Sequence, residues 1–372
     1  MRHLRILHVI NSLETGGAQR LIGDLLPALA ASTAASVSVV VFHHSNSGIE
    51  SRLKEKGIPV ISLNAKERSL STIAKLIPHI RKADIIHAHL FPTCYMVALA
   101  NIFCHKPLIY TEHSTHNKRR DHKWLKPLEK IIYSRYNRIV CISNATAVNL
   151  GKWIGEKMCD NKVSIIHNGI DFSKFQHLKP TNQTSLFGRS GIPILMISRF
   201  TASKDQATVI KALSLIKNTD VFVAFAGEGE TISEMKTLTN EYNLSDRVLF
   251  LGNREDTPQL IKASYIGIQS SRWEGFGLTV VEMMAGKIPV IVSDIHGLRE
   301  ISADATLTFK PGDYKTLAQL IDTLLEDPLK YEHIANRCAE RALNFSITDT
   351  IAKHIELYND LMTQISGSKR LG

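Results

Sequence analysis

The sequence lacks long apolar runs, paired cysteines and a leader-like N-terminus. Its clearly apolar stretches, such as 37–42, are strand-sized and far shorter than the roughly 18 residues of a transmembrane helix. The five cysteines are odd in number and form no CxxC pair, which favours a reduced, cytosolic compartment without a zinc site. Residues 4–10 are too short for a secretory signal and no small-residue cleavage site follows.

The composition is that of an ordinary globular chain. The sequence is 44% hydrophobic, 22% charged and 7% aromatic, which excludes disordered, collagen-like and disulfide-scaffold proteins. A chain of 372 residues exceeds one ordinary core and indicates about two domains.

The positive charge is confined to one half of the chain. Residues 1–172 hold 23 Lys and Arg against 12 Asp and Glu, a net charge of +11, whereas residues 173–372 hold 22 and 23, a net charge of −1. A basic half indicates a nucleic acid, an anionic membrane or an anionic substrate, and charge alone does not choose among them.

Short apolar runs alternate with amphipathic stretches, a pattern that predicts parallel sheets covered by helices. The predicted strands are 4–10, 37–42, 60–63, 85–88, 108–111, 138–142 and 163–166 in one half, and 192–197, 221–226, 248–251, 266–269 and 290–292 in the other. We expect two doubly wound α/β domains facing a central cleft. Their predicted bounds are 1–172 and 192–349, with a linker at 173–191 and a helix at about 350–365 packing back on the first domain.

Three loops that follow predicted strands carry glycines or cations. Gly16 and Gly17 suit either a plain strand–helix turn or close approach to a ligand. Gly227 and Gly229 suit either close backbone approach or a loop that needs a positive φ. Arg199 and Lys204 lie five residues apart at a strand end, where they would either be solvated or neutralise a diphosphate.

The most informative block is Ser270-Ser-Arg-Trp-Glu-Gly-Phe-Gly277 and the helix that follows it. Its glycines open a helix whose first amides make an anion site without a cation. Glu274 precedes this helix and Glu282 lies within it, where carboxylates accept hydrogen bonds from sugar hydroxyls. The bare spacing of two glutamates would indicate only two surface residues.

In this context Glu274 and Glu282 resemble the E-x7-E motif of the retaining glycosyltransferases of family 4, which have the GT-B fold. Further matches cover roughly residues 4–345: Gly16 to Arg20, Tyr110 to His113, Cys141 to Asn144, His167 to Asp171, and the loops at 199–204, 227–229 and 251–252. Gln19 stands where many relatives have glutamate, which affects only the acceptor side of that loop.

The resemblance implies a role for each matching residue. Glu282 would bind the ribose of a nucleotide sugar, and the Gly277 and Leu278 amides with Arg199 and Lys204 would hold the diphosphate. Glu274 would bind the donor hexose and His113 would lie over the reacting sugar. The other implied donor contacts are Gly17, Gly227, Asn253, Arg254 and Phe276.

The family transfers sugars with retention of anomeric configuration and generally without a metal, so we expect neither a metal nor another cofactor. Arg199 and Lys204 would then carry the leaving-group charge. The sequence does not name a nucleophile, and it leaves covalent and front-face routes open.

Residues 118–138 are strongly basic and contain apolar residues at near-helical spacing. Trp124, Leu128 and Ile131 are either a core stripe or an anchor for an anionic bilayer. The predicted membrane or acceptor contacts are Lys118, Arg119, Arg120, Lys123 and Trp124. We expect a cytoplasmic enzyme at the inner face of the cytoplasmic membrane.

The sequence thus predicts a glycosyltransferase that moves a hexose or N-acetylhexosamine from a nucleotide diphosphate sugar, expected to be a UDP-sugar, to a lipid-linked or polysaccharide acceptor of a surface polymer. An epimerase of the same fold is the alternative, distinguished by action on the donor alone. A phosphorylase would need a pyridoxal lysine, for which nothing argues. Nucleic-acid binding would explain the charge but not the Glu274 block.

Overall fold

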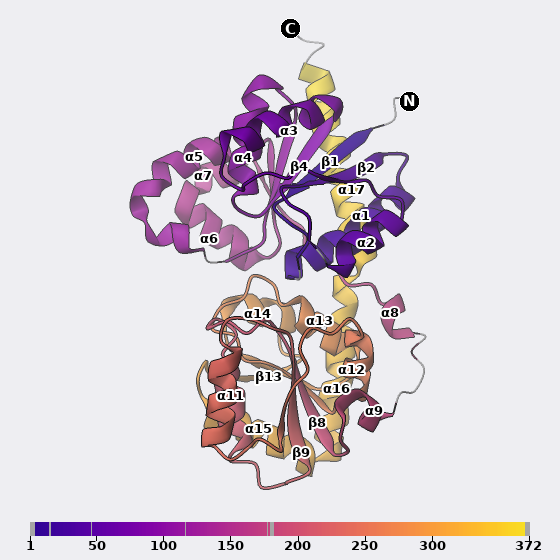
Figure 1. Ribbon diagram of the computed structural model, residues 1–372, viewed down its shortest axis with the longest axis vertical. Helices are drawn as coiled ribbons and strands as arrows, with labels where there is room; N and C mark the ends of the chain where they lie inside the picture. The colour runs from indigo at the N-terminus through magenta and orange to yellow at the C-terminus, as the bar shows by residue number, and fades with distance from the viewer. Residues whose placement is uncertain are drawn as a thin grey trace. The chain divides into compact units, whose positions relative to one another are not determined.

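The computed structural model describes residues 4–14, 16–45, 47–115, 117–176, 178 and 182–368. The described chain forms two compact units (Figure 1). The first contains the residues up to Gly169 together with those from Ile347 onward, and the second runs from Ile170 to Ser346. None of the helices in these ranges is long and apolar enough to cross a membrane.

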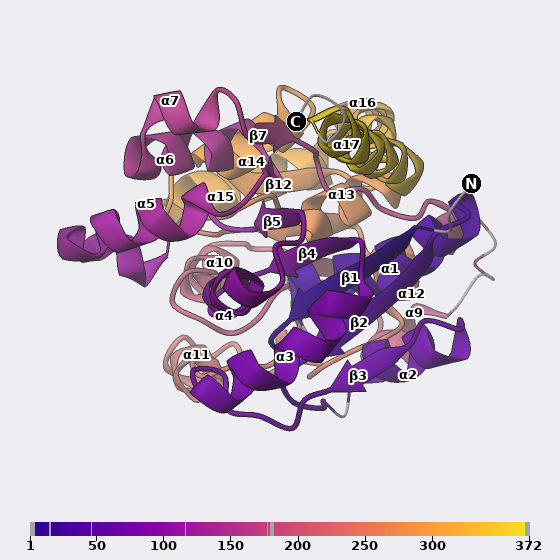
Figure 2. The same ribbon diagram turned by 90° about the horizontal axis from the view of Figure 1, so that it is seen from above.

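The first unit is built on a parallel sheet in the order β3-β2-β1-β4-β5-β6-β7. Figure 2 shows its neighbouring strands β2, β1, β4 and β5 between helix α3 on one side and helix α17 on the other. The strands are β1 Arg5–Ile10, β2 Ser36–Val41, β3 Val60–Ser62, β4 Ile85–His89, β5 Leu108–Glu112, β6 Arg138–Cys141 and β7 Val163–Ile165.

The helices of this unit cover both faces of the sheet because neighbouring strand residues point to opposite sides. Leu7 and Val9 of β1 pack in one apolar cluster, whereas Ile6 and Ile10 pack in another. The helices are α1 Gly17–Ser32, α2 Gly48–Glu55, α3 Leu70–Lys82, α4 Thr93–Ala100, α5 Lys126–Ser134, α6 Asn144–Ile154, α7 Glu156–Cys159 and α17 Ile347–Ser368, with 3-10 turns at η1 Asn101–Phe103, η2 Lys118–Asp121 and η3 Lys123–Leu125.

The second unit has a parallel sheet in the order β10-β9-β8-β11-β12-β13. Its strands are β8 Ile192–Ile197, β9 Val221–Ala226, β10 Val248–Phe250, β11 Ile266–Gln269, β12 Val290–Ser293 and β13 Leu307–Phe309. Every residue of β9 is buried, as expected for an inner strand of a sheet covered on both faces. The helices are α8 Ser173–Gln176, α9 Gln183–Phe187, α10 Gln206–Leu213, α11 Ile232–Glu241, α12 Thr257–Ala263, α13 Leu278–Ala285, α14 His296–Ser302, α15 Tyr314–Glu326 and α16 Pro328–Ala342, followed by η4 Leu343–Phe345.

The segment 173–191, predicted as an irregular linker, contains the helices α8 and α9 in its described part. Phe187 is buried and packs edge-on against Phe222 of β9, so α9 belongs to the second unit. The polar composition that suggested a linker concealed this apolar anchor. Residues 177 and 179–181 of the segment lie outside the described part, as do residues 369–372 at the C-terminus.

The last helix, α17, packs on the first unit. Its apolar residues Ile351, Leu357 and Leu361 are buried in the cluster that contains α1, and Thr350 donates a hydrogen bond to the carbonyl oxygen of His167 at 2.9 Å. That the first unit binds the acceptor and the second unit binds the donor stays a prediction.

Candidate functional site

The loops with the predicted donor residues follow adjacent strands of the second unit. Strand β8 lies between β9 and β11, so the direction of strand order reverses there. Open α/β sheets bind ligands beyond the carboxyl ends of their strands at such a reversal. The loop after β8 carries Arg199 and Lys204, and the loop after β11 carries Glu274, which brings these predicted residues to one edge of the sheet.

Lys204 and Glu274 form an ion pair that joins these two loops. The Lys204 Nζ contacts Oε2 of Glu274, and their side chains are 21% and 17% exposed. The hydroxyl of Ser271 donates to the same carboxylate oxygen at 3.4 Å. Partial burial strengthens an ion pair relative to one in open water, so an anion that binds Lys204 would compete with Glu274.

Two buried polar residues that received no role from the sequence hold the loops in place. The Ser270 hydroxyl lies 2.9 Å from the carbonyl oxygens of both Lys204 and Asp205. The Gln206 amide donates to the Arg199 carbonyl at 3.0 Å. Arg199 itself is exposed, which leaves its guanidinium accessible to a ligand.

The N-terminus of α13 lies directly after Glu274. Gly277 has a left-handed backbone (φ 92°), and a Cβ there would lie 2.7 Å from Leu298 Cδ2; both features require glycine. Leu278 is the first residue of α13, where amides lack intrahelical partners. Glu282 is half-buried within the same helix, so the structure places both motif glutamates on one loop–helix element.

The structure places the Phe276 ring in the core of the second unit. Its side chain is only 2% exposed and packs edge-on against Phe345, with ring centroids 5.6 Å apart. A buried ring supports the loop that carries it, and a part of Phe276 in shaping the donor pocket stays a prediction. Its place in the motif is explained by packing.

Gly227 and Gly229 are also explained within the protein. Gly227 has a φ of 141°, and a Cβ there would lie against the carbonyl of Ser198. A Cβ on Gly229 would meet the backbone of Phe200. The glycines therefore let two neighbouring loops approach closely, and approach of the same backbone to a ligand stays a prediction.

Asn253 and Arg254, the predicted base contacts, follow β10. The Asn253 amide donates to Glu228 Oε2 at 3.2 Å, which joins this loop to the one after β9. The Arg254 guanidinium pairs with Asp256 through contacts of 2.7 and 2.5 Å, and this bond lowers the pKa of Asp256. The Asn253 side chain is exposed and that of Arg254 is half-buried.

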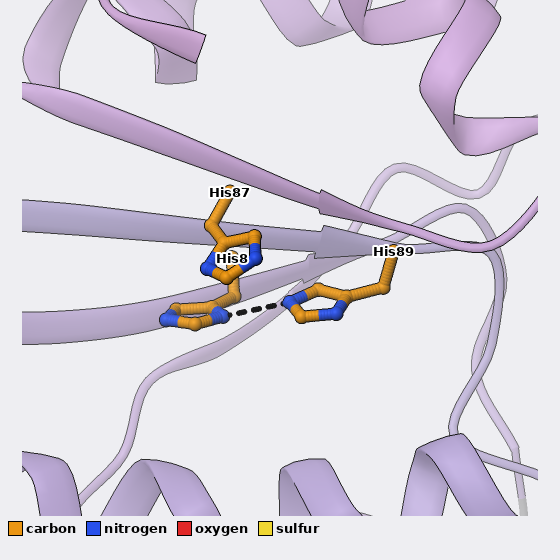
Figure 3. A group of neighbouring side chains, drawn as sticks. All are labelled: His8, His87 and His89. Carbon is orange, nitrogen blue, oxygen red and sulfur yellow. Dashed lines mark hydrogen bonds between the residues drawn. The ribbon is translucent and has the colours of Figure 1, made fainter. Parts of the chain in front are cut away.

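In the first unit, His113 follows β5 and belongs to a group of histidines that the sequence did not assign. His113 Nε2 lies 3.2 Å from Nδ1 of His89. His89 Nε2 in turn lies 3.0 Å from Nδ1 of His8 (Figure 3). The sequence signal that could have identified this group was the alternation His87-Ala-His89, because residues two apart on a strand share one face.

His8, His87 and His89 offer ligand atoms within 4.8 Å of one another and are of the residue type that binds zinc. However, His87 Nδ1 lies 2.7 Å from the Tyr358 hydroxyl and Nε2 lies 2.6 Å from that of Thr111. The rings of His87 and His89 stack with their centroids 4.3 Å apart, and Figure 3 shows the three side chains close together. Nitrogen lone pairs lie in the ring planes, so stacked rings do not direct them at one ion, and we propose no metal for this group.

Two of the cations predicted to contact a membrane are inside the protein. Arg119 pairs with the fully buried Glu129 at 2.6 Å and lies over the ring of Phe91. Arg120, only 9% exposed, pairs with the buried Glu112 at 2.6 Å. These ion pairs contradict a membrane contact of the two residues, which the sequence could not reveal because their carboxylate partners lie elsewhere in it. The acceptor contact that was predicted as the alternative stays a prediction. The side chain of Lys118 lies outside the described part.

The apolar stripe of the same segment is exposed. Trp124, Leu128 and Ile131 are 76%, 46% and 57% exposed and share one face at helical spacing. Ile132 and Tyr133 occupy the buried face of α5. The core interpretation of the stripe was therefore wrong. The exposed cations along it are Lys123, Lys130 and Arg135.

Gly17 is the first residue of α1 and has open space on its Cβ side. Nothing in the described protein requires glycine there, so a role in ligand approach stays a prediction.

Two family models match the chain. Residues 15–174 match Glycosyltransferase Family 4, and residues 184–342 match Glycosyl transferases group 1. An Escherichia coli relative, UDP-Gal:alpha-D-GlcNAc-diphosphoundecaprenol alpha-1,3-galactosyltransferase, is 27% identical over 81% of both chains. The GDP-mannose:cellobiosyl-diphosphopolyprenol alpha-mannosyltransferase of Xanthomonas oryzae is 23% identical over 81% of this chain and 82% of its own.

Solved structures show the same fold. HepE from Anabaena, in complex with UDP and glucose, has a TM-score of 0.86 at 22% identity and covers 96% of this chain and 100% of its own. Sucrose-phosphate synthase from Thermosynechococcus elongatus has a TM-score of 0.80 at 19% identity, covering 97% and 100%. These likenesses confirm the predicted α/β architecture with two Rossmann-like parallel-sheet units, the GT-B fold.

Proposed function

The chain belongs to the family 4 and group 1 glycosyltransferases, and from this premise we propose that it is a retaining enzyme that uses a nucleotide diphosphate sugar. The donor is a UDP-hexose or UDP-N-acetylhexosamine, and the acceptor is a lipid-linked glycan of a surface polymer. Two relatives whose names specify diphosphate-linked polyprenol acceptors support the choice of acceptor.

The observation that carries the proposal is the Lys204–Glu274 pair at the strand-order reversal of the second unit. Bound donor would draw Lys204 to its diphosphate and free Glu274 for a hydroxyl of the sugar. Arg199 and the amides of Gly277 and Leu278 would add further donors for the phosphate oxygens.

The charge that develops on the departing nucleotide is the main electrostatic demand of the reaction. Lys204 and Arg199 are two cations on one loop, and fixed charges at a leaving group stabilise the transition state. We propose that they supply this charge without a divalent ion. Turnover is then expected to persist in excess EDTA, and restoration only by added Mg²⁺ or Mn²⁺ would contradict this part of the proposal.

The remaining donor contacts of the proposal are those that the resemblance to family 4 implies. Glu282 binds the ribose, Asn253 and Arg254 lie beside the base, and Gly17 approaches the donor. The Phe276 ring is buried, so the proposal gives its side chain no donor contact, whereas Gly227 keeps the backbone approach to the donor that the resemblance implies. His113 contacts the reacting sugar, as the resemblance implies.

Nucleotide sugars test the proposal directly. A binding donor stabilises the folded state by mass action, by about 2.7 kcal/mol at a concentration 100 times its Kd. We expect a UDP-sugar to raise the apparent unfolding temperature and to yield a glycosylated polyprenol diphosphate with the donor's anomeric configuration. An epimerised donor in the absence of acceptor would support the epimerase instead, and inversion in the product would contradict retention.

We further propose that the exposed stripe of Trp124, Leu128 and Ile131 lies on an anionic bilayer at the inner face of the cytoplasmic membrane. An exposed aromatic residue with aliphatic neighbours buries apolar area in the interface, and flanking cations attract anionic lipid. Lys123, Lys130 and Arg135 are exposed beside the stripe, so its charge complements that surface. This position would bring the enzyme to a lipid-linked acceptor.

Vesicle cosedimentation tests the membrane proposal. We expect the protein to bind vesicles of phosphatidylcholine with phosphatidylglycerol at low salt and to dissociate as salt rises. Trp124→Ala combined with Leu128→Ser should abolish most binding, whereas Leu329→Ser, which changes an 81% exposed leucine of the second unit, should not. Equal binding to neutral vesicles, or none at low salt, would overturn it.

A further inference from the structure

A row of three hydrogen-bonded histidines leads from the core of the first unit to His113. His8 lies in β1, His89 lies at the end of the neighbouring β4, and His113 follows β5. The contacts are His8 Nδ1 to His89 Nε2 at 3.0 Å and His89 Nδ1 to His113 Nε2 at 3.2 Å (Figure 3 shows the first). His8 and His89 are buried and His113 is half-buried.

The three rings are neutral. Burial lowers the pKa of His8 and of His113 to about 3 and holds the pKa of His89 well below its usual value. A neutral imidazole has one N–H donor and one acceptor nitrogen. A row of such rings has only two arrangements, in which every bond points toward His113 or every bond points toward His8.

The buried end of the row distinguishes the two arrangements. His8 Nε2 is buried and has no hydrogen-bond partner among the described residues. If every bond pointed toward His8, this nitrogen would carry an unpaired N–H in the core, and a buried N–H donor almost always has a hydrogen-bond partner. If every bond points toward His113, His8 Nε2 is only an unused acceptor and each ring carries its proton on Nδ1.

We propose that His8 and His89 are positioning residues that hold His113 as its Nδ1–H tautomer, so that His113 donates a hydrogen bond to a hydroxyl oxygen of the sugar substrate. The substrate part rests on the proposed function, whereas the tautomer does not. His113 is then a donor and not a base. His87 stays outside the row because Tyr358 and Thr111 occupy both of its nitrogens.

Nitrogen NMR of the full-length protein labelled with ¹⁵N-histidine reads the tautomer directly. His113→Asn assigns the signal. At pH 7.5 we expect the proton of His113 on Nδ1 and an unprotonated Nε2. A proton on Nε2 of His113 in the wild type would overturn the inference, whether or not the protein transfers sugar. An inactive protein with the Nδ1 proton would contradict the proposed function and leave the tautomer standing.

Two near-isosteric variants of His8 test the direction of the row. In His8→Asn, the amide N–H replaces the Nδ1–H and donates to His89. In His8→Asp, an ionised carboxylate only accepts, so it should turn both bonds around and move the His113 proton to Nε2. We expect His8→Asn to keep kcat within about threefold, and His8→Asp to lower kcat about 10- to 100-fold with little change in donor KM.

The two variants also separate positioning from mere structure. An equal fall of kcat in both would mean that His8 only supports the fold, which would overturn the inference. A reversed tautomer with unchanged kcat would overturn the donor role of His113. If His8→Asp does not fold, His89→Asn replaces it: the Asn amide can still donate to His113, so rescue relative to His89→Phe supports the proposal, and equal loss in both overturns it.

Discussion

Lys204 is a cation that lies where the sheet topology predicts a ligand site. It lies at the strand-order reversal of the second unit and its partner Glu274 comes from the neighbouring loop. Its side chain is only one-fifth exposed, so its removal affects the packing of the two loops as well as their charge.

We predict that Lys204→Ala lowers kcat/KM by about 100-fold or more, because loss of one group that stabilises developing charge costs roughly 3–4 kcal/mol in the transition state. Glu282→Ala should reduce turnover severely as well. Lys262→Ala, which removes an exposed cation from α12, is the matched control. Initial-rate kinetics of all three variants provide the check, and near-normal turnover in both Lys204→Ala and Glu282→Ala would mean that the donor site lies elsewhere.

At this scale the sequence predicted which loops carry chemistry but not how each side chain is used. From the sequence, Arg119 and Arg120 were interpreted as exposed cations, because Glu129 and Glu112 come close to them only in the folded chain. The row of His8, His89 and His113 was missed for the same reason, because its members come from three separate segments. Phe276 matched a motif, yet its burial depends on Phe345, 69 positions later.

Among the elements, the loop after β9 shows why glycine occurs beside the proposed site. Gly227 combines a φ of 141° with a Cβ position against the Ser198 carbonyl. Gly188 also has a positive φ, 74°, but open space around it. A comparison of the two positions therefore separates the cost of a left-handed backbone from the cost of a clash with a neighbouring loop.

We predict that Gly227→Ala destabilises the second unit more than Gly188→Ala. The Gly188 variant meets only the left-handed penalty of about 1–2 kcal/mol, whereas the Gly227 variant adds displacement of a backbone neighbour. For a unit of this size, 1 kcal/mol shifts the unfolding temperature by about 2–4 °C. Calorimetry should show a drop of about 10 °C or more for Gly227→Ala and about 2–8 °C for Gly188→Ala. Equal shifts would mean that the two loops can separate at little cost.

Strands could be predicted from the sequence where an apolar run forms an inner strand of a sheet that is covered on both faces, as in β9. The missed strand β13 has three residues, of which Thr308 is exposed, so no apolar run marks it. Helix α6 was missed because its sequence mixes small and polar residues. Ser143 starts it by accepting from the Thr146 amide at 3.1 Å, and its buried Trp153 anchors the other end by donating to Glu129.

Over the whole chain, the buried histidines make the stability of the first unit depend on pH. His8, His87, His89 and His113 belong to its strands and the loop after β5, and His354 comes from α17, near the other end of the chain. Burial lowers the pKa of His354 to about 4 and that of His8 and His113 to about 3. The usual pKa of histidine in an unfolded chain is about 6.5.

Because the folded pKa values lie below the unfolded one, the unfolded chain binds more protons from about pH 6.5 downward. The folded unit must therefore lose stability as pH falls through this range, and the loss continues to about pH 4, where His354 begins to titrate in the folded state. Each unit of pKa shift corresponds to about 1.4 kcal/mol. Carboxylates of this unit with a lowered pKa, such as Glu50, contribute only at lower pH.

We predict that the unfolding temperature of the first unit decreases steadily from pH 7 to pH 4.5, measured by calorimetry at constant ionic strength. His354→Leu removes one of the titrating groups and keeps an apolar side chain in the same cluster, so its stability should fall less steeply over the same range. A wild-type unit whose unfolding temperature is flat between pH 6.5 and 4.5 would contradict the prediction. It would mean that water or a charged partner reaches the histidines, and the neutral row leading to His113 would lose its physical basis.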